Sequence, residues 1–495
     1  MEFWNDIINT AMIGTDKKSV SVNDLPVALQ QAAAFIYANN TIDKDEQFLQ
    51  LAAVCFNYRQ AGILPLHKET ITLAQCPTEE KLYCNNAAMQ VLKDIFLEES
   101  TSLLKYWLQQ CDAKRQVAHP QIIPSLLMQG VQQKKLQSLI ASCCGKRGEW
   151  LSRFNEAWNF SQNQTAEQLW QTGTPEQRKT IFKETRIAEP AVAAAWLQQA
   201  WPQEDANTKI GFLEIFSISV NETDIPFLTS LATEKSKKVK DEAVNLLKQI
   251  ASSDIVQLYQ QALQQSVELK KEKTLLGLSS KMMLQFHLPL SIDESIFKTG
   301  IEKLSNNKYF SDDEFIIFQL IQAVPPVFWE KQFAMDAGTI IDLFQKNSIG
   351  KKLAPALAAA AIQFKTAGWA VQLIEQDEDF YAGLLPLLPL PQQEKYSNKF
   401  FEKHTESIIQ YAVQREAEWS NELTTNILRH VAKNPYHYHR SFFNHHIQLI
   451  PASIIIGLQK IVLTDEGLQV MWNNTSDYII KLISLKTKVL KAFNE

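Results

Sequence analysis

The chain has 495 residues, a formal net charge of −5 and a pI near 6.1, so it lacks the overall positive field that drives sequence-independent nucleic-acid binding. Its length exceeds the roughly 100–200 residues of a single domain, and a hydrophobic share of 45% is enough to build a core. With only 15 glycines and 18 prolines, and with Leu, Gln, Ala, Lys and Glu abundant, the composition predicts an all-α fold.

The N-terminal third carries amphipathic patterns that predict several helices and a less regular stretch at 61–83. The helices are expected over 2–15, 24–38, 44–59, 86–97, 100–111, 123–130 and 132–142. The first segment has no basic start and is interrupted by polar residues, so it does not have the pattern of a signal peptide. We therefore expect a cytoplasmic protein.

The six cysteines show no regular spacing, which indicates free, buried thiols in a reducing compartment. They are Cys55, Cys76, Cys84, Cys111, Cys143 and Cys144. A zinc site at Cys76 and Cys84 is the weaker alternative, because a gap of this size fits no common zinc knuckle.

The stretch that begins at Gly145 superficially resembles a phosphate-binding loop. Ile140 stands where the first glycine of that motif belongs, and Arg147 stands where Ser or Thr belongs, so we reject the interpretation. We predict instead a helix end marked by Gly145, followed by a turn anchored by Trp150.

A regular series of helices is predicted over 175–185, 190–200, 205–219, 225–234 and 239–251. The last helix has an apolar stripe of Val239, Ala243, Leu246, Leu247 and Ile250. In the helix before it, Ala232 is expected on the buried side and Asp224 as an N-cap that accepts backbone amides.

The stretch 225–250 resembles a HEAT repeat. It has Pro226 in its first helix, a polar turn, Val239-Lys240 where such repeats usually carry Val-Arg, and then Ala243 and Leu247. Because one such pair cannot bury its apolar stripe alone, the resemblance implies an α-solenoid of stacked helix pairs.

Farther along, a helix at 254–269 is expected to end in a polar turn at 270–273, with an apolar segment at 274–285 and a junction near 287–294. The apolar run 447–463 is too short to span a membrane and predicts a buried helix. The last helix, 475–493, is expected to cap the terminal repeat. We divide the chain into an N-terminal helical region (1–145), a HEAT-like core (146–286) and a C-terminal helical region (287–495) that can continue the solenoid.

Two clusters are candidates for chemistry. Neutral imidazoles of His437, His439, His445 and His446 suit zinc, nickel or copper, but no carboxylate or cysteine stands at metal spacing, so a polar turn packed between helices is favoured. The acidic run Asp312-Asp313-Glu314 suits the N-cap and first turn of a helix better than a metal.

The turn between the two helices of the HEAT-like stretch is basic. Its lysines are Lys235, Lys237, Lys238 and Lys240. A solvated turn is the plain interpretation, and contact with an acidic partner or a phosphate backbone is the functional one. The tryptophans Trp150, Trp158, Trp170 and Trp196 are expected in the core between repeats.

Several motifs together resemble a bacterial family of unknown function, DUF5691. They are Trp4 with Ala11–Lys17, Arg147–Leu151 with Asn155 and Trp158, Glu167–Trp170, Gly173-Thr174 with Arg178, Arg186 with Glu189-Pro190, Trp201-Pro202, Asp312–Phe315, and Val324–Pro326 with Trp329-Glu330. The resemblance implies a helical-repeat protein. Genes of this family tend to lie near those of MoxR-type AAA+ ATPases, von Willebrand A-domain proteins and SWIM zinc-finger proteins, which implies partners of these kinds.

Three functions remain open at this point. The first is a non-enzymatic scaffold, without a cofactor, that binds protein partners such as an AAA+ ATPase or a von Willebrand A-domain protein. The second is a nucleic-acid-associated repeat protein that uses the basic turns, which the net negative charge disfavours. The third is a metal-dependent enzyme built around the C-terminal histidines.

Overall fold

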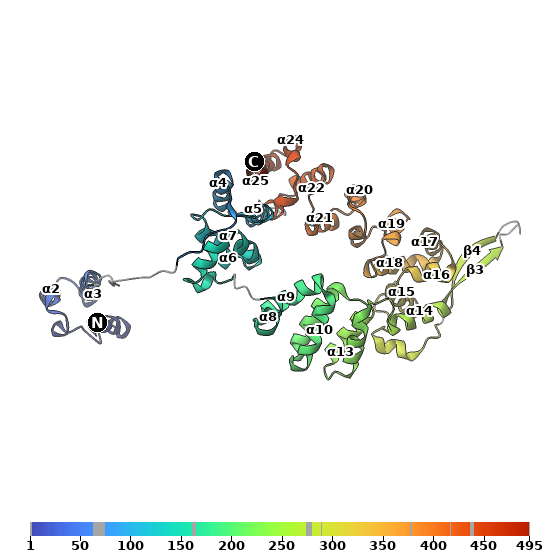
Figure 1. The fold of residues 1–495 in the computed structure, drawn as a ribbon, viewed down its shortest axis with the longest axis horizontal. Helices are drawn as coiled ribbons and strands as arrows, with labels where there is room; N and C mark the ends of the chain where they lie inside the picture. The colour runs from blue at the N-terminus through green and yellow to red at the C-terminus, as the bar shows by residue number, and fades with distance from the viewer. Residues whose placement is uncertain are drawn as a thin grey trace. The chain divides into compact units, whose positions relative to one another are not determined.

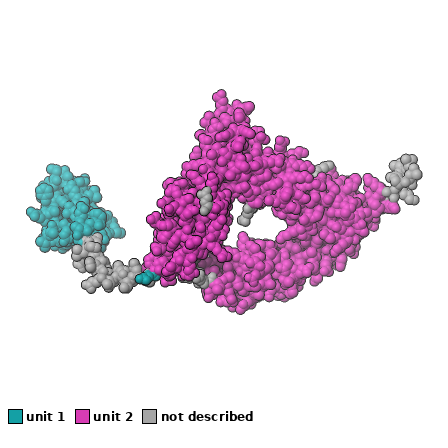
Figure 2. Space-filling view, turned by 45° about the horizontal axis from the view of Figure 1, so that its top comes forward, with its two compact units in different colours: residues 1–75 teal, residues 76–495 magenta. Residues whose placement is uncertain are grey.

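The computed structural model of the chain describes residues 2–62, 75–160, 165–273, 280–288, 290–376, 379–415, 417–435 and 440–494. Within these ranges the chain is mostly helical, which confirms the all-α prediction. Contacts between Cα atoms divide it into unit 1, residues 1–75, and unit 2, residues 76–495, which Figure 2 colours separately. The boundaries expected at 145/146 and 286/287 both fall inside unit 2, and the three-region division stays a prediction.

Unit 1 contains α1 (Glu2–Ile13), α2 (Val27–Tyr37) and α3 (Lys44–Ala61), with a short 3-10 helix η1 (Val22–Asp24). Unit 2 begins with α4 (Asn86–Leu97), α5 (Thr101–Ala113), α6 (Ile123–Gln132) and α7 (Gln137–Ser152). It continues with α8 (Ala166–Thr172), α9 (Pro175–Ala188), α10 (Pro190–Ala200), α11 (Ala206–Phe216), α12 (Ile225–Ser230), α13 (Lys237–Leu247) and α14 (Asp254–Ser266).

The remaining helices are α15 (Asp312–Gln322), α16 (Val327–Phe333), α17 (Ala337–Lys346), α18 (Ser348–Gln363), α19 (Ala367–Gln376), α20 (Leu390–Phe400), α21 (Thr405–Gln414), α22 (Asn421–Lys433), α23 (Arg440–His446), α24 (Ile455–Leu458) and α25 (Glu466–Asn494). The strands are β1 (Leu82–Tyr83), β2 (Gln116–Val117), β3 (Val267–Lys273) and β4 (Ser280–Phe286). The 3-10 helices of unit 2 that matter below are η4 (Trp201–Gln203), η5 (Ser217–Ser219), η7 (Leu231–Thr233), η8 (Glu294–Thr299), η10 (Ile447–Leu449) and η11 (Ala452–Ile454).

Among the described residues, buried side chains form three apolar clusters. One belongs to α1–α3 in unit 1, and a second belongs to α8–α13. The third joins α4–α7 to α14–α25, so two segments that are far apart in the sequence share one core. Of the helices that the structure describes, none combines the length and the apolar character that a membrane span requires.

The C-terminal helix α25 lies beside α4 and α5 (Figure 1), although almost 400 residues separate them in the chain. The ring of Phe493 packs edge-on against Trp107 with 5.3 Å between ring centroids, and Asn85 Nδ2 donates to the Ala492 carbonyl at 2.7 Å. The predicted end cap therefore packs against the first helices of unit 2 as well as against α22 and α23, and its buried residues extend from Trp472 to Phe493.

The buried lysine of α25, Lys486, has its positive charge compensated by neighbouring acceptors. Lys486 is 3% exposed, and its ammonium donates to the Gln448 and Ile450 carbonyls at 2.9 and 2.8 Å and pairs with Glu418 at 2.6 Å. A buried ammonium needs such partners, because leaving it unpaired in an apolar surrounding is costly. These contacts tie α25 to the segment around η10.

The polar turn expected at 270–273 is wrong, because these residues belong to a β-hairpin. Strand β3 pairs antiparallel with β4, with Leu269 opposite Leu284 and Val267 opposite Phe286. Val267 and Leu284 are buried, whereas Lys270 and Lys271 are exposed. The apolar residues thus recur at every second position, which suits a strand, and the run of charges concealed that period.

The buried helix predicted within the apolar run 447–463 is found only in part. The segment forms η10, η11 and α24, and Pro451 stands at the N-cap of η11. Proline lacks an amide N–H and cannot continue a helix from the preceding turn. The expected burial is nevertheless found, with Ile447, Ile450, Ile454 and Leu458 each under 5% exposed.

At Gly145 the backbone adopts φ 55° and ψ −156°, which interrupts α7. An L side chain is strained at this φ, so glycine is required for the interruption. The predicted helix end is found there, but the residues that follow are helical through Ser152 and do not form a turn.

A buried ion pair holds together the helices that follow. Arg186 and Asp224 have fully buried side chains and form an ion pair. The guanidinium also donates to the Pro190 and Ser219 carbonyls at 2.9 and 3.0 Å and lies 3.7 Å from the centroid of the Phe216 ring. Arg186 of α9 thereby connects the start of α10, the segment after α11 and the start of α12.

This ion pair corrects the role expected of Asp224. The residue does stand at the N-cap of α12, but its side chain makes no capping bond to that helix. Its carboxylate accepts from Arg186 and from the Asn221 amide, the latter at 2.9 Å. By contrast, the acidic run in the first turn of α15 behaves as predicted: Glu314 completes a capping box with Ser311, and it also pairs with Lys352 at 2.9 Å.

We expect Asp224→Ala to lower the free energy of unfolding by about 3–5 kcal/mol, because it leaves the Arg186 guanidinium buried without a counter-charge. Asp342→Ala is the matched control, since it breaks a half-exposed pair with Lys346 and should cost about 0.3–0.5 kcal/mol. Urea unfolding followed by tryptophan fluorescence measures both. Equal losses in the two variants would contradict the structural role given to Arg186.

We expect Phe493→Ala to loosen α4 and α5 as well as α25, because its ring fills the contact with Trp107 and truncating a buried Phe costs about 3–5 kcal/mol. Hydrogen exchange with mass spectrometry should show faster exchange in all three helices. Val470→Ala at an exposed position of α25 should change none of them. Faster exchange confined to α25 would show that it acts only as an end cap.

Candidate partner-binding site

Helices α9, α11 and α13 begin at a constant interval. Their N-caps are Thr174, Asp205 and Ser236, which are 31 residues apart in each step. Each helix is preceded by a helical segment that ends just before the cap: α8 before α9, α10 with η4 before α11, and α12 with η7 before α13. We call these combinations the first, second and third pair, and in Figure 1 they follow one another along one part of unit 2. Residues at equivalent positions can therefore be compared directly.

In the first pair, a tryptophan ring is covered by a cation that a glutamate holds. Trp170 is 5% exposed, and the Arg178 guanidinium carbon lies 4.4 Å from its ring centroid. Arg178 also donates from Nε to the Trp170 carbonyl at 2.9 Å and from a terminal nitrogen to Glu204 at 2.6 Å. The other neighbours of the ring include Phe182, stacked at 5.4 Å. We call this combination of ring, cation and carboxylate an aromatic seat.

The second pair repeats the aromatic seat. Trp201 is 7% exposed, and Lys209 Nζ lies 4.9 Å from its ring centroid. Glu234 accepts from Lys209 at 2.9 Å and from the indole nitrogen of Trp201 at 2.6 Å. The cation follows the ring by eight residues in both seats, and the glutamate follows the ring by 34 residues in the first and 33 in the second.

The third pair has the cation but neither the ring nor the glutamate. Lys240 stands 31 residues after Lys209, and Ala232 stands where Trp201 stood one interval earlier. In front of Ala232 lies an open hollow of about 550 Å³. It is lined by Ile225, Leu228, Thr229, Ala232, Lys237, Lys240, Asp241, Ala243, Val244, Leu247, Ser253, Asp254, Ile255 and Lys298.

The open hollow explains one wrong prediction. Ala232 was expected on the buried side of its helix, but it is exposed, while Leu228 and Leu231 of the same stripe are 1% and 3% exposed. The apolar stripe was placed on the correct face of the helix. Ala232 is exposed because no described side chain covers the end of the stripe at which it lies. The predicted stripe of α13 is confirmed, because Val239, Ala243, Leu246, Leu247 and Ile250 are all buried.

The predicted basic residues lie at the rim of this hollow and at the start of α13. Lys235, Lys237 and Lys238 are exposed, and Lys240 is half-buried. None of the four forms an ion pair with another described residue, although Asp241 and Asp254 also line the hollow. Lys298 of η8 also lines the hollow and adds a further positive charge.

The lysines stand at the unfavourable end of a helix. The N-terminus of a helix carries a partial positive charge, so acidic groups stabilise it and cations do not. Helix α9 has Glu176 in its first turn, and Asp205 caps α11 through the amides of Asn207 and Thr208. Helix α13 has no acid in its first turn, and the side chain of Ser236 makes no capping bond.

The histidine candidates are only partly within the described residues. His437 and His439 lie outside them. The imidazole rings of His445 and His446 lie 6.4 Å apart, and His445 Nδ1 is 2.6 Å from the Ser441 carbonyl of its own helix. Burial lowers the pKa of His446, with a smaller effect from His445. Across the described ranges, no three His, Cys, Asp or Glu side chains group closely enough to hold a metal ion.

The cysteines and tryptophans follow the predictions in part. Five cysteines are buried, and Cys76 is half-buried. Burial raises the pKa of the Cys84 thiol to about 11, which keeps it protonated at neutral pH. Of the tryptophans expected in the core between pairs, Trp170 is buried, whereas Trp150, Trp158 and Trp196 are half-buried.

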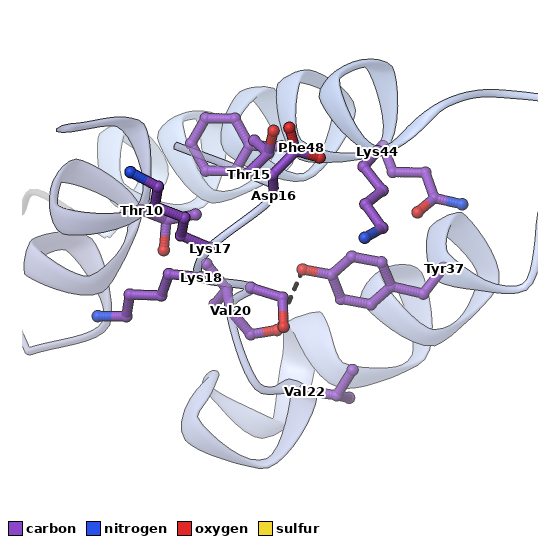
Figure 3. A pocket seen from close by; sticks show the side chains of 12 residues that line it. Thr10, Thr15, Asp16, Lys17, Lys18, Val20, Val22, Tyr37, Lys44 and Phe48 are labelled. Carbon is purple, nitrogen blue, oxygen red and sulfur yellow. Dashed lines mark hydrogen bonds between the residues drawn. The ribbon is translucent and has the colours of Figure 1, made fainter. Parts of the chain in front are cut away.

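Unit 1 contains a separate pocket of about 390 Å³. Figure 3 shows Lys44 and Tyr37 on one side of it and Thr10 and Lys17 on the other. The Tyr37 hydroxyl donates to the Val20 carbonyl at 3.0 Å, and burial raises the pKa of Tyr37. This pocket includes part of the Ala11–Lys17 motif but takes no part in the site around α13.

The aromatic seats were missed by the motif search, although their signal was present in the sequence. Trp170 and Trp201, Arg178 and Lys209, and the three N-caps all recur at 31 residues. A search for this interval would have found the pairs. It could not have shown that the cations cover the rings, because that depends on how consecutive pairs pack.

The chain belongs to the DUF5691 family, described as a family of unknown function, whose sequence model matches residues 6–493. No curated protein and no solved structure matches the chain. The match covers nearly the whole chain and thus includes both units, and it confirms the resemblance seen in the motifs.

The free energy of unfolding should fall at acidic pH, in part because Glu234 of the second aromatic seat becomes protonated. The Lys209 ammonium, aided by the Trp201 indole, holds the pKa of Glu234 below its usual range. A carboxyl with a depressed folded-state pKa contributes stability that is present above the unfolded pKa, about 4.3, and lost as pH falls through the folded pKa. We expect Glu234→Gln to lose less stability than the native chain between pH 6 and about pH 3, as measured by urea unfolding. Parallel losses would contradict the assignment.

Proposed function

We propose that the protein is a non-enzymatic scaffold of the α-solenoid, HEAT-like type that binds an acidic protein partner at the start of α13. The observation that carries the proposal is the set of lysines, Lys235, Lys237, Lys238 and Lys240, at a helix N-terminus that lacks acidic residues. This placement is unfavourable in the isolated protein. It becomes favourable when acidic groups of a partner cover it.

The pattern of helix pairs supports the scaffold part of the proposal. Three pairs follow at an interval of 31 residues, and the buried Arg186 guanidinium holds three of their segments in place. A rigid series of this kind presents loop and first-turn residues at defined spacings. The partner then binds a surface that needs little rearrangement, which lowers the cost of association.

The chemistry of the surface favours a protein over nucleic acid. The lysines adjoin an apolar hollow with walls formed by Leu228, Val244 and Leu247, and the chain as a whole has a net charge of −5. Nucleic-acid affinity depends mainly on the number of phosphates neutralised, whereas protein interfaces combine an apolar centre with a charged rim. An AAA+ ATPase or a von Willebrand A-domain protein in the cytoplasm is the kind of partner that the family resemblance implies.

We expect Lys237→Glu/Lys238→Glu to stabilise the free protein and to weaken partner binding. Each substitution places an acid in the first turn of α13 and should raise the free energy of unfolding by about 0.3–1 kcal/mol. Urea unfolding measures the first effect. Quantitative mass spectrometry of proteins that co-purify with the full chain from its native cells measures the second, and at least one partner should be depleted.

Lys270→Glu/Lys271→Glu is the control with the same change of charge, since both lysines are exposed on β3 and away from α13. It should leave the co-purifying proteins unchanged. Equal recovery of every protein with the two variants would overturn the proposal. Retention of the native chain on mixed DNA and RNA at about 50 mM salt, lost in the α13 variant, would overturn it in favour of nucleic-acid binding.

A further inference from the structure

We infer that the open hollow beside Lys240 receives one aromatic side chain of the partner, together with a neighbouring carboxylate that pairs with Lys240. The inference rests on the proposed function and specifies the chemistry of the partner. It follows from a comparison of three equivalent positions in one chain, two of which the chain fills with its own side chains.

The two filled seats show what this position takes. In both, an indole ring lies beneath a cation, 4.4 Å from Arg178 in the first seat and 4.9 Å from Lys209 in the second. In both, a glutamate from the next helix pair holds the cation. A cation over an aromatic face is attracted by the negative face of the ring, and the attraction grows when water is excluded.

The third position keeps the cation of the filled seats and the apolar residue that follows it in the helix. Lys240 occupies the place of Arg178 and Lys209, and Val244 occupies the place of Phe182 and Leu213. The ring is replaced by Ala232. The residues that follow Ala232 by 33 and 34 positions, Gln265 and Ser266, carry no charge. This seat therefore lacks two groups, an aromatic ring and a carboxylate.

The chain does not supply these groups because the series of helix pairs ends here. After α14 the backbone enters the β3–β4 hairpin and does not form another helix that begins 31 residues after Ser236. Ser253, Asp254 and Ile255 at the start of α14 line the hollow together with Lys298 but do not cover it. The hollow consequently stays open to solvent.

The hollow has the size and the walls for an aromatic side chain. Its volume of about 550 Å³ falls within the roughly 300–1,000 Å³ of pockets that bind compact ligands. Leu228 and Leu247 are 1% and 8% exposed at its base, and Ile225, Val244 and Ile255 are half-buried around it. A planar ring placed there buries apolar surface without displacing a side chain that is already paired.

The charges around the hollow favour an acid beside the ring. Lys237, Lys240 and Lys298 line it together with Asp241 and Asp254, which leaves one positive charge in excess. In the filled seats, Glu204 and Glu234 pair with the cation. A partner carboxylate in the equivalent position would pair with Lys240 in the same way. A neutral aromatic residue alone would leave that ammonium to be partly desolvated without a counter-charge, which is costly.

The test uses a probe taken from the chain itself. A fluorescently labelled peptide copying residues 197–206, LQQAWPQEDA, carries one tryptophan followed by two acids. Fluorescence anisotropy with the full-length protein should give saturable binding below about 1 mM, which corresponds to about 4 kcal/mol. Peptides with Trp201→Ala, or with Glu204→Gln and Asp205→Asn, should bind at least about threefold more weakly.

Protein variants locate the binding. Ala232→Trp should fill the seat with the chain's own ring and weaken the peptide at least about tenfold. Thr233→Trp, which adds the same ring at an exposed neighbour outside the hollow, should leave binding within about twofold. Lys240→Met keeps the length of the side chain without its charge and should weaken binding by about three- to tenfold, and it tests the seat independently of any effect of Ala232→Trp on folding.

Two results would overturn the inference. They are the absence of saturable binding by the peptide, and binding that is unchanged in both Ala232→Trp and Lys240→Met. The proposed function is judged separately by co-purification with the Lys237→Glu/Lys238→Glu variant. If that variant loses a partner while Ala232→Trp retains it, the partner uses the lysines without the seat, and only the inference fails.

Discussion

The buried guanidinium of Arg186 is the interaction on which the α8–α13 region depends. A cation without access to water must find hydrogen-bond acceptors, and the two terminal nitrogens of Arg186 find them in Asp224 and in the Pro190 and Ser219 carbonyls, whereas its Nε has no hydrogen-bond partner among the described residues. Those acceptors belong to three consecutive parts of the chain, so satisfying one side chain sets the position of three helix pairs. The aromatic ring of Phe216 completes the enclosure.

The positions set in this way bring cations over aromatic rings. Arg178 covers Trp170 and Lys209 covers Trp201, and in each case a glutamate of the following pair holds the cation. The aromatic seat is complete in two places. At Lys240 the ring and the carboxylate are missing, and the chain continues into a hairpin. Where the chain continues with another helix pair, the seat is a structural contact. Where it does not, the seat is open and is a candidate binding site.

Local sequence pattern was reliable where a single period governs burial. The stripe of α13 was predicted residue by residue, and the acidic run Asp312-Asp313-Glu314 was recognised as the capping first turn of a helix. It failed where two signals compete. The charges of β3 concealed an alternation of two, and the apolar run 447–463 forms short helical segments where a longer helix was expected within it. Asp224 was assigned to a nearby amide because its buried partner, Arg186, is 38 residues away.

By itself the sequence determined the helical character of the chain, the buried stripe of α13 and membership of the DUF5691 family. Periodicity shows which face of a helix avoids water, because that depends only on the spacing of neighbouring residues. It does not show which distant element covers that face. The tertiary structure alone decided that α25 packs against α4 and α5, that two cations lie over tryptophans, and that Ala232 faces an open hollow. Each of these results depends on how segments pack against one another, which the spacing of residues along the chain does not show.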